Sequence, residues 1–249
     1  MSKLVQINSK DRVSPDTTTA SDFRVNLGND GRISSVKAIS VKEIQFVNSF
    51  TNINVNNNKL YYTTGGVEDF VEVSPGQYTF DELSPVLIAA FGAKSITFTT
   101  GIGDTTKRLT FTSTPAISYN KYKLDGSKNP MARVLGIASA DVVEYNALVA
   151  TSLPDLSGIK SVYVCSPQLS GGQFISSNTL GSVLDVVPVT VPFGSFVSHS
   201  GEAGGSDSHV YANELQNNLS TIDIQLRDED NQLLDCNGTE FVCILKIYT

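Results

Sequence analysis

The stretch that decides the fold is residues 220–248, STIDIQLRDEDNQLLDCNGTEFVCILKIY. From Ile222 to Arg227 apolar and polar side chains alternate, and this period of two predicts a β-strand with one buried face. A polar segment follows and ends in Asn237-Gly238, a pair that readily adopts the positive φ angles of a tight reversal. We therefore expect a β-hairpin here.

The second strand of this expected hairpin is apolar on both of its faces. One face carries Phe241, Cys243, Leu245 and Ile247, and the other carries Val242, Ile244 and Tyr248. A strand of this kind belongs in the middle of a β-sandwich or against a neighbouring subunit. The fold class that follows is all-β: a single jelly-roll β-sandwich with one short helix and long decorated loops.

Composition and the order of polar and apolar segments suggest how the domain is organised. The chain has 249 residues, of which 40% are hydrophobic and 17% are charged, enough apolar material to fill a core. Residues 1–21 are mostly polar and predict an N-terminal arm that docks on another surface or frays. No linker-like composition divides the remainder, so residues 22–249 are expected to form a single jelly-roll domain.

Further strands are expected along this domain. In residues 33–47 the apolar phase slips twice, which predicts a β-bulge or burial on both sides. Gly65-Gly66 predicts a hairpin turn. The other expected strands are residues 22–27, 57–63, 67–73, 95–100, 107–112, 161–166, 182–191 and 195–199.

One helix is expected, because apolar residues recur at helical spacing at Leu83, Val86, Leu87, Ala90 and Phe91. The sequence allows two positions for the N-terminus of this helix. Thr79 and Glu82 can form a capping box, which places Pro85 inside the helix. Alternatively Ser84 is the N-cap and Pro85 takes the first helical position. Residues 129–136 predict a further short helical turn that ends at Gly136.

Residues that could carry catalysis are few. The chain has two histidines, His199 and His209, and the nearby hydroxyl and carboxyl side chains are Ser198, Ser200, Asp207 and Ser208. A Ser-His-Asp triad is a spatial arrangement that adjacency in sequence does not predict, and no nucleophile-elbow motif is present. We read these residues as polar loop residues, so no catalytic residue and no enzyme activity are expected.

Cofactor and metal sites are likewise not expected. Asp228-Glu229-Asp230-Asn231 departs from a calcium loop at Gln232 and Leu233 and predicts a turn instead. Cys165, Cys236 and Cys243 have no zinc spacing, and we expect three reduced core thiols. Gly101-Ile102-Gly103 is an isolated turn motif with no phosphate-binding pattern around it.

Charge argues against direct binding of nucleic acid. The net charge is −7, and Lys107-Arg108 is the one adjacent basic pair. Residues 1–43 carry seven Lys/Arg and five Asp/Glu, a net of +2, whereas residues 185–240 carry one Arg and ten Asp/Glu, a net of −9. This asymmetry allows copies to associate head to tail, although solvated acidic loops explain it equally well. No apolar run is long enough for a membrane span.

Several motifs, in their order along the chain, resemble those of a known family. They are Ser9-Lys10-Asp11-Arg12 with Asp22-Phe23, Val47-Asn48-Ser49-Phe50-Thr51-Asn52, Ser74-Pro75-Gly76 before the helix, Val134-Leu135-Gly136-Ile137, Asp155-Leu156-Ser157-Gly158, and the segments 162–169 and 226–238. In this succession the chain resembles the penton, or vertex minor capsid, proteins of virophages, polinton-like viruses and nucleocytoplasmic large DNA viruses. Residues 201–208 have no counterpart in this resemblance.

The resemblance implies a structural capsid protein. Its expected partners are four further copies in a homopentamer and the neighbouring double jelly-roll major capsid proteins, and it leaves room for other minor capsid proteins. It implies a location in the virion, at the capsid vertex, after synthesis in the host cytoplasm or a viral factory. A ring built from head-to-tail contacts closes without leaving unpaired interfaces.

Two other functions share the fold class. A jelly-roll carbohydrate- or receptor-binding module is the alternative function, for which Tyr61, Tyr62, Tyr119 and Tyr122 would have to supply an aromatic platform. A cupin-like enzyme would need clustered histidines and carboxylates, and two histidines argue against it.

Overall fold

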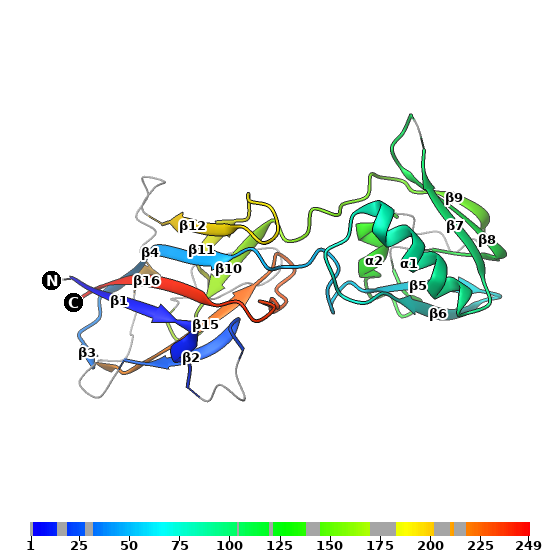
Figure 1. Cartoon of the computed structure of the whole chain (residues 1–249). Coiled ribbons are helices and arrows are strands. Elements are labelled where there is room, and N and C mark those ends of the chain that lie inside the picture. The colour runs from blue at the N-terminus through cyan, green and yellow to red at the C-terminus, as the bar shows by residue number, and fades with distance from the viewer. Residues whose placement is uncertain are drawn as a thin grey trace. The chain divides into compact units, whose positions relative to one another are not determined.

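The structure is a computed structural model, and it describes residues 2–13, 19–27, 32–103, 105–119, 122–137, 145–169, 183–201, 210–211 and 218–249. The chain divides into two compact units (Figure 1). Unit 1 comprises Met1–Phe50 and Ile159–Thr249, and unit 2 comprises Thr51–Gly158. Each unit has a hydrophobic core of its own.

This division differs from the single domain that we expected over residues 22–249. Unit 2 is inserted between two strands of unit 1, and its helix and strands bury their apolar sides on one another. No boundary is visible in the amino-acid sequence, because the chain crosses between the units in short segments, at residues 50–51 and 158–159, without a Gly- or Pro-rich linker.

Unit 1 contains two antiparallel sheets. One has the order β1-β16-β4-β12, with β13 also paired to β4; the bounds are Ser2–Asn8, Phe241–Tyr248, Ala38–Val47, Phe196–Ser200 and Val210–Tyr211. The other has the order β11-β10-β15-β2, with bounds Val183–Pro188, Ser161–Cys165, Thr221–Arg227 and Asp22–Asn26. A short ladder joins β3 (Ile33–Ser34) to β14 (Asn218–Leu219), and the 3-10 helix η1 spans Ser9–Asp11.

The pairing of these strands is nested. β1 pairs with β16, β2 with β15, β4 with β12, and β10 with β11, all antiparallel. The first strand thus lies beside the last, and the fourth beside the fifth, which is how an eight-stranded jelly roll is built. The all-β class and the jelly-roll sandwich that the sequence predicted are confirmed in this unit.

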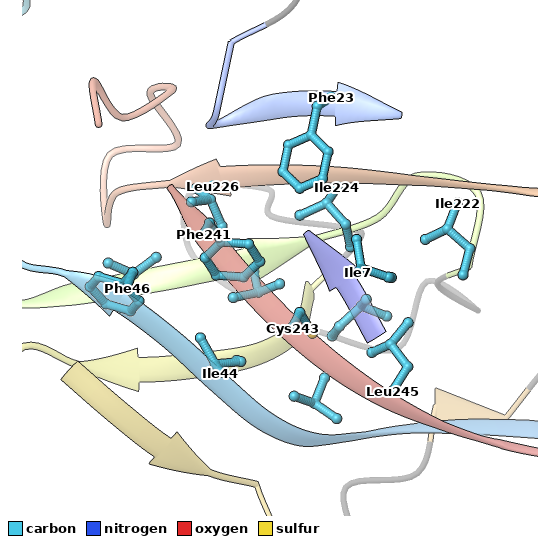
Figure 2. Packing of buried hydrophobic residues seen from close by; sticks show 14 of the residues in the cluster. Ile7, Phe23, Ile44, Phe46, Ile222, Ile224, Leu226, Phe241, Cys243 and Leu245 are labelled. Carbon is cyan, nitrogen blue, oxygen red and sulfur yellow. The ribbon is translucent and has the colours of Figure 1, made fainter. Parts of the chain in front are cut away.

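The core of unit 1 lies between the two sheets (Figure 2). Phe241 from β16 stacks on Phe46 from β4 and meets the ring of Phe23 from β2 edge-on, with 6.4 Å between ring centroids in both pairs. Side chains from the facing sheet, Ile222, Ile224 and Leu226, complete this packing. Alternation along β15 and β16 therefore places every second residue in one shared core.

β16 occupies the middle of its sheet, between β1 and β4, as its two apolar faces predicted. The inward face is fully buried, whereas the outward face, with Val242, Ile244 and Tyr248, is half-buried. The predicted bulge is also present, because the register of β16 against β4 shifts where Ile244 and Leu245 oppose Glu43 and Val41, leaving Lys42 as the extra residue.

The expected hairpin over residues 220–248 is wrong. β15 and β16 lie in different sheets, and residues 228–240 connect one sheet to the other. Asn237 and Gly238 do adopt positive φ angles, of 46° and 74°. The tight turn that these two residues form, however, lies within the connection between the two sheets. Each strand finds its partners among earlier strands, which the local pattern cannot reveal.

The expected N-terminal arm is also wrong for the part of it that the structure describes. Residues 2–8 pair with residues 242–248 of β16, and Ile7 is fully buried (Figure 1, where the two strands run side by side). Beyond β1, the Phe241 N–H donates to Ser9 Oγ at 3.0 Å, and Arg12 donates to the Ser9 carbonyl at 2.7 Å. The segment looks polar because β1 is an edge strand whose outward side chains are exposed.

Unit 2 contains a β-hairpin, a three-stranded sheet and two helices. The hairpin pairs β5 (Lys59–Thr64) with β6 (Val67–Glu72), and the sheet has the order β7-β8-β9, with bounds Thr97–Ile102, Leu109–Ile117 and Tyr145–Val149. The helices are α1 (Phe80–Gly92) and α2 (Pro130–Val134). The predicted turn at Gly65-Gly66 is present, with both residues at positive φ.

The capping-box start of α1 is confirmed, and the start at Ser84 is wrong. The Glu82 N–H donates to Thr79 Oγ1, and the Glu82 carboxylate accepts from the Thr79 N–H at 2.8 Å. Pro85 therefore lies inside the helix. The apolar stripe of Leu83, Leu87 and Phe91 is fully buried in the core of unit 2, and this packing outweighs the backbone hydrogen bond that Pro85 cannot donate.

Candidate functional site

His199 lies on β12 and faces into the sandwich, where its Nε2 is 3.5 Å from the Asp185 Oδ2 on β11. The two strands belong to different sheets, so this pair joins the sheets at one edge of unit 1. Burial raises the pKa of Asp185 above its ordinary value, against the opposing effects of the Val186 N–H and of His199. Sequence reasoning missed Asp185, because its partner lies fourteen positions away across a loop.

The other members of the possible Ser-His-Asp set do not meet this imidazole in the part of the chain that the structure describes. Ser198 and Ser200 alternate with His199 on β12 and point to the opposite face, where the Ser198 hydroxyl donates to Glu43 at 3.5 Å. Asp207, Ser208 and His209 lie outside the described residues, as do residues 202–206 of the loop that the family resemblance did not cover.

The Asp228 segment forms the turn that was predicted. The Asp228 Oδ1 accepts the N–H groups of Asp230 and Gln232 at 2.9 and 2.8 Å, and Asn231 has a φ of 63°. The Asp228 carboxylate thus stabilises the backbone of its own loop by hydrogen bonds. Within the described ranges no cluster of three or more His, Cys, Asp or Glu could hold a metal ion.

The three cysteines are free and buried. Burial raises the pKa of Cys165 to about 11 and that of Cys236 to about 12, and it raises the pKa of the fully buried Cys243 further still. A raised pKa keeps each thiol protonated near neutral pH, and the thiolate is the reactive form. The prediction that the three cysteines are core residues is therefore confirmed.

We expect these thiols to make the protein sensitive to alkali. The unfolded state releases thiol protons above its ordinary pKa of 9.0, whereas the folded state retains them until a higher pH. These thiols therefore leave the free energy of unfolding unchanged below pH 9 and lower it as the pH rises above 9, by about 1.4 kcal/mol per pH unit for each thiol. Thermal midpoints measured from pH 7 to 10.5 test this.

The matched variant is Cys165→Ala, which removes one titrating group and should make the decline less steep. Buried Tyr62, whose pKa is raised to about 12 mainly by burial, adds to the decline above pH 10 in both proteins. A midpoint that stays constant between pH 8 and pH 10.5 would contradict the expectation.

Three of the four tyrosines that could have formed an aromatic platform for a carbohydrate are buried or covered, and the fourth, Tyr122, is 46% exposed. Tyr62 and Tyr119 are buried in the core of unit 2. Tyr61 packs on Phe70, and lysine ammonium groups cover the two rings: Lys123 lies 4.9 Å from the Tyr61 centroid, and Lys59 lies 4.9 Å from that of Phe70. A cation–π contact thus covers a face of each of these two rings.

The motifs that carry the family resemblance form hydrogen bonds that hold the backbone. The Asn52 amide donates to the carbonyls of Tyr78 and Leu156, at 2.7 and 2.9 Å, and accepts from the Tyr78 N–H at 2.9 Å. It therefore ties together the two segments at which the chain enters and leaves unit 2. In unit 1, Asn48 donates to Val191, and Ser49 donates to Cys236.

The remaining candidate residues lie at the surface of unit 2. Lys107 and Arg108 are exposed in the turn between β7 and β8, next to Gly103, whose N–H donates to the Arg108 carbonyl at 2.9 Å. No helix among the described residues is long and apolar enough to cross a membrane.

Comparison with known proteins finds similarity only at the level of solved structures. No family model and no curated protein sequence match the chain. The crystal structure of the mavirus penton protein is similar over 99% of both chains, with a TM-score of 0.48 and 11% identity. A chain of the Sputnik virophage, solved by cryo-EM, is similar over 99% of this chain and 97% of its own length, with a TM-score of 0.43 and 12% identity.

Proposed function

We propose that this chain is a structural capsid protein that forms the pentameric penton at the fivefold vertices of an icosahedral double-stranded DNA virus shell. The observation that carries the proposal is the succession of penton-like motifs along a chain whose unit 1 is an eight-stranded jelly roll. The residues of these motifs that the structure describes, such as Ser9, Asn48 and Asn52, hold strands and connections in place.

The environment of the candidate catalytic residues supports a structural role. His199 is paired with a buried carboxylate, the cysteines are protonated and buried, and the Asp228 carboxylate is engaged by backbone N–H groups. All of these groups take part in the packing or the hydrogen bonding of unit 1. The proposed partners are identical copies and the surrounding major capsid proteins, and the proposed location is the virion.

The test is the oligomeric state of the purified full chain. Native mass spectrometry is expected to give a species five times the 26.7 kDa of one chain, and electron microscopy is expected to show rings with fivefold symmetry. If the ring needs the shell to form, the fivefold species appears on mixing with the major capsid protein of the same virus. A chain that stays monomeric both alone and in this mixture would contradict the proposal.

A further inference from the structure

The three-stranded sheet of unit 2 has one face in the core and one face outside. Phe98, Leu109 and Phe111 point inward and are buried. The alternate residues point outward and are exposed or half-exposed; we call them the threonine face, and they are Thr97, Thr99, Gly101, Thr110, Thr112, Thr114, Ala147 and Val149. In the sequence, this face is marked by threonines that recur at every second position of the two neighbouring strands β7 and β8.

The register of the strands makes this face regular. Thr97 lies opposite Thr114, and Thr99 lies opposite Thr112. The hydroxyls of Thr99 and Thr112 are hydrogen-bonded to each other. The Thr110 hydroxyl donates to the Gly101 carbonyl at 3.3 Å. On the third strand Ala147 lies opposite Thr112, and Val149, which is 54% exposed, opposite Thr110. The surface therefore consists of short side chains fixed by cross-strand pairs.

The chemistry of the threonine face suits contact with another protein surface. It carries no charged side chain, although the whole chain has a net charge of −7. Burying it desolvates no ion, and the centres of protein interfaces are depleted in charge. Threonine is stiff at χ1 and loses little freedom when covered. Among the eight residues of the threonine face there is no aromatic ring on which a sugar could stack and no cation that could bind a phosphate.

The size of the threonine face determines which occupant it fits. Three strands about 4.8 Å apart, each contributing about six residues at 3.3 Å, give about 300 Å². A stable complex of free proteins buries about 800 Å² on each partner. A face this small cannot recruit a partner from solution, but it can add to a contact between molecules that another interface already holds together.

We propose that the threonine face contacts a neighbouring copy of this chain in the assembled oligomer, an inference that rests on the proposed function. Identical copies all carry the same excess of negative charge, so they approach most easily where their surfaces are uncharged. The contact supplements the association of the jelly rolls and does not replace it.

Thiol labelling of single-cysteine reporters tests the proposal. Thr112→Cys places a thiol at the centre of the face, and Val67→Cys places a control thiol at a position that is 68% exposed in the β5–β6 hairpin. The native cysteines are buried and protonated, so they contribute little background. We expect a maleimide to label Cys at position 112 at least about tenfold more slowly in the oligomer than in dilute monomer, with position 67 unchanged.

A second pair of variants measures the energetic contribution. Thr112→Lys should weaken assembly at least about tenfold while leaving the thermal midpoint of the monomer unchanged, whereas Val67→Lys should assemble like the parent protein. Oligomers in which position 112 labels at the monomer rate, or in which Thr112→Lys assembles normally, overturn this inference and leave the proposed function standing. Protection that arises only on addition of major capsid protein also overturns it, and a protein that never assembles overturns both proposals.

Discussion

Deleting residues 1–12 will prevent unit 1 from folding cooperatively. The deletion removes the seven residues of β1 that pair with β16, the buried Ile7 and the contacts of Ser9 and Arg12 with residues 240–241. Loss of one buried aliphatic side chain costs about 2–5 kcal/mol, and each hydrogen bond adds about 1 kcal/mol, so the total exceeds about 5 kcal/mol. Circular dichroism during heating should show no cooperative transition for this unit.

Two point variants on the same strand provide the matched comparison. Ile7→Ala should lower the free energy of unfolding by about 2–5 kcal/mol, because Ile7 is fully buried. Leu4→Ala should change it by less than about 1 kcal/mol, since Leu4 is 59% exposed on the other face. A deletion variant that melts like the full chain would show that this segment is an arm and not a strand that unit 1 needs.

Gly136→Ala is expected to destabilise unit 2 by about 4 kcal/mol. Gly136 has a φ of 77°, and a Cβ added there would lie 2.3 Å from the Ser152 carbonyl oxygen and 2.9 Å from that of Leu153. The same glycine accepts the Ser152 N–H at 3.0 Å, so the two backbone segments cannot separate without losing this hydrogen bond. Chemical denaturation monitored by circular dichroism measures the effect.

Gly66→Ala separates the two causes of this loss. Gly66 has nearly the same φ, 78°, but a Cβ there would meet nothing within 4 Å. The variant should therefore lose only the cost of a left-handed alanine, about 1–2 kcal/mol. Equal losses in both variants would show that the close approach of Ser152 to Gly136 contributes nothing.

Local patterns predicted the elements of this fold better than their partners. The alternation in β15 and β16, the phase slip in β4 and the capping box of α1 each depend on neighbours in sequence, and each was found. The hairpin over residues 220–248 failed because both of its strands pair with strands far away in the chain. Likewise, the edge strand β1 buries only Ile7 fully, and its apolar residues Leu4, Val5 and Ile7 do not alternate regularly enough to distinguish a strand from an arm.

The candidate sites show the same contrast between features that local sequence determines and features that long-range packing determines. Spacing and neighbouring residue types were enough to predict that Asp228 belongs to a turn and that the cysteines are core residues. The pairing of His199 with Asp185 and the burial of Tyr62 and Tyr119 depend on which sheet faces which, and no window of sequence contains that information. The division into two units was missed because each crossing of the chain is short.

The nested pairing of the jelly roll also sets an order of events during synthesis. Ser9 and Glu240, which hydrogen-bond beside the β1–β16 ladder, are 231 positions apart, so β1 must wait for almost the entire chain to leave the ribosome. Unit 2 is contiguous from Thr51 to Gly158 and can complete its core long before that. In the meantime the nascent sandwich strands expose unpaired edges, and a chaperone that shields them would act on unit 1 and leave unit 2 alone.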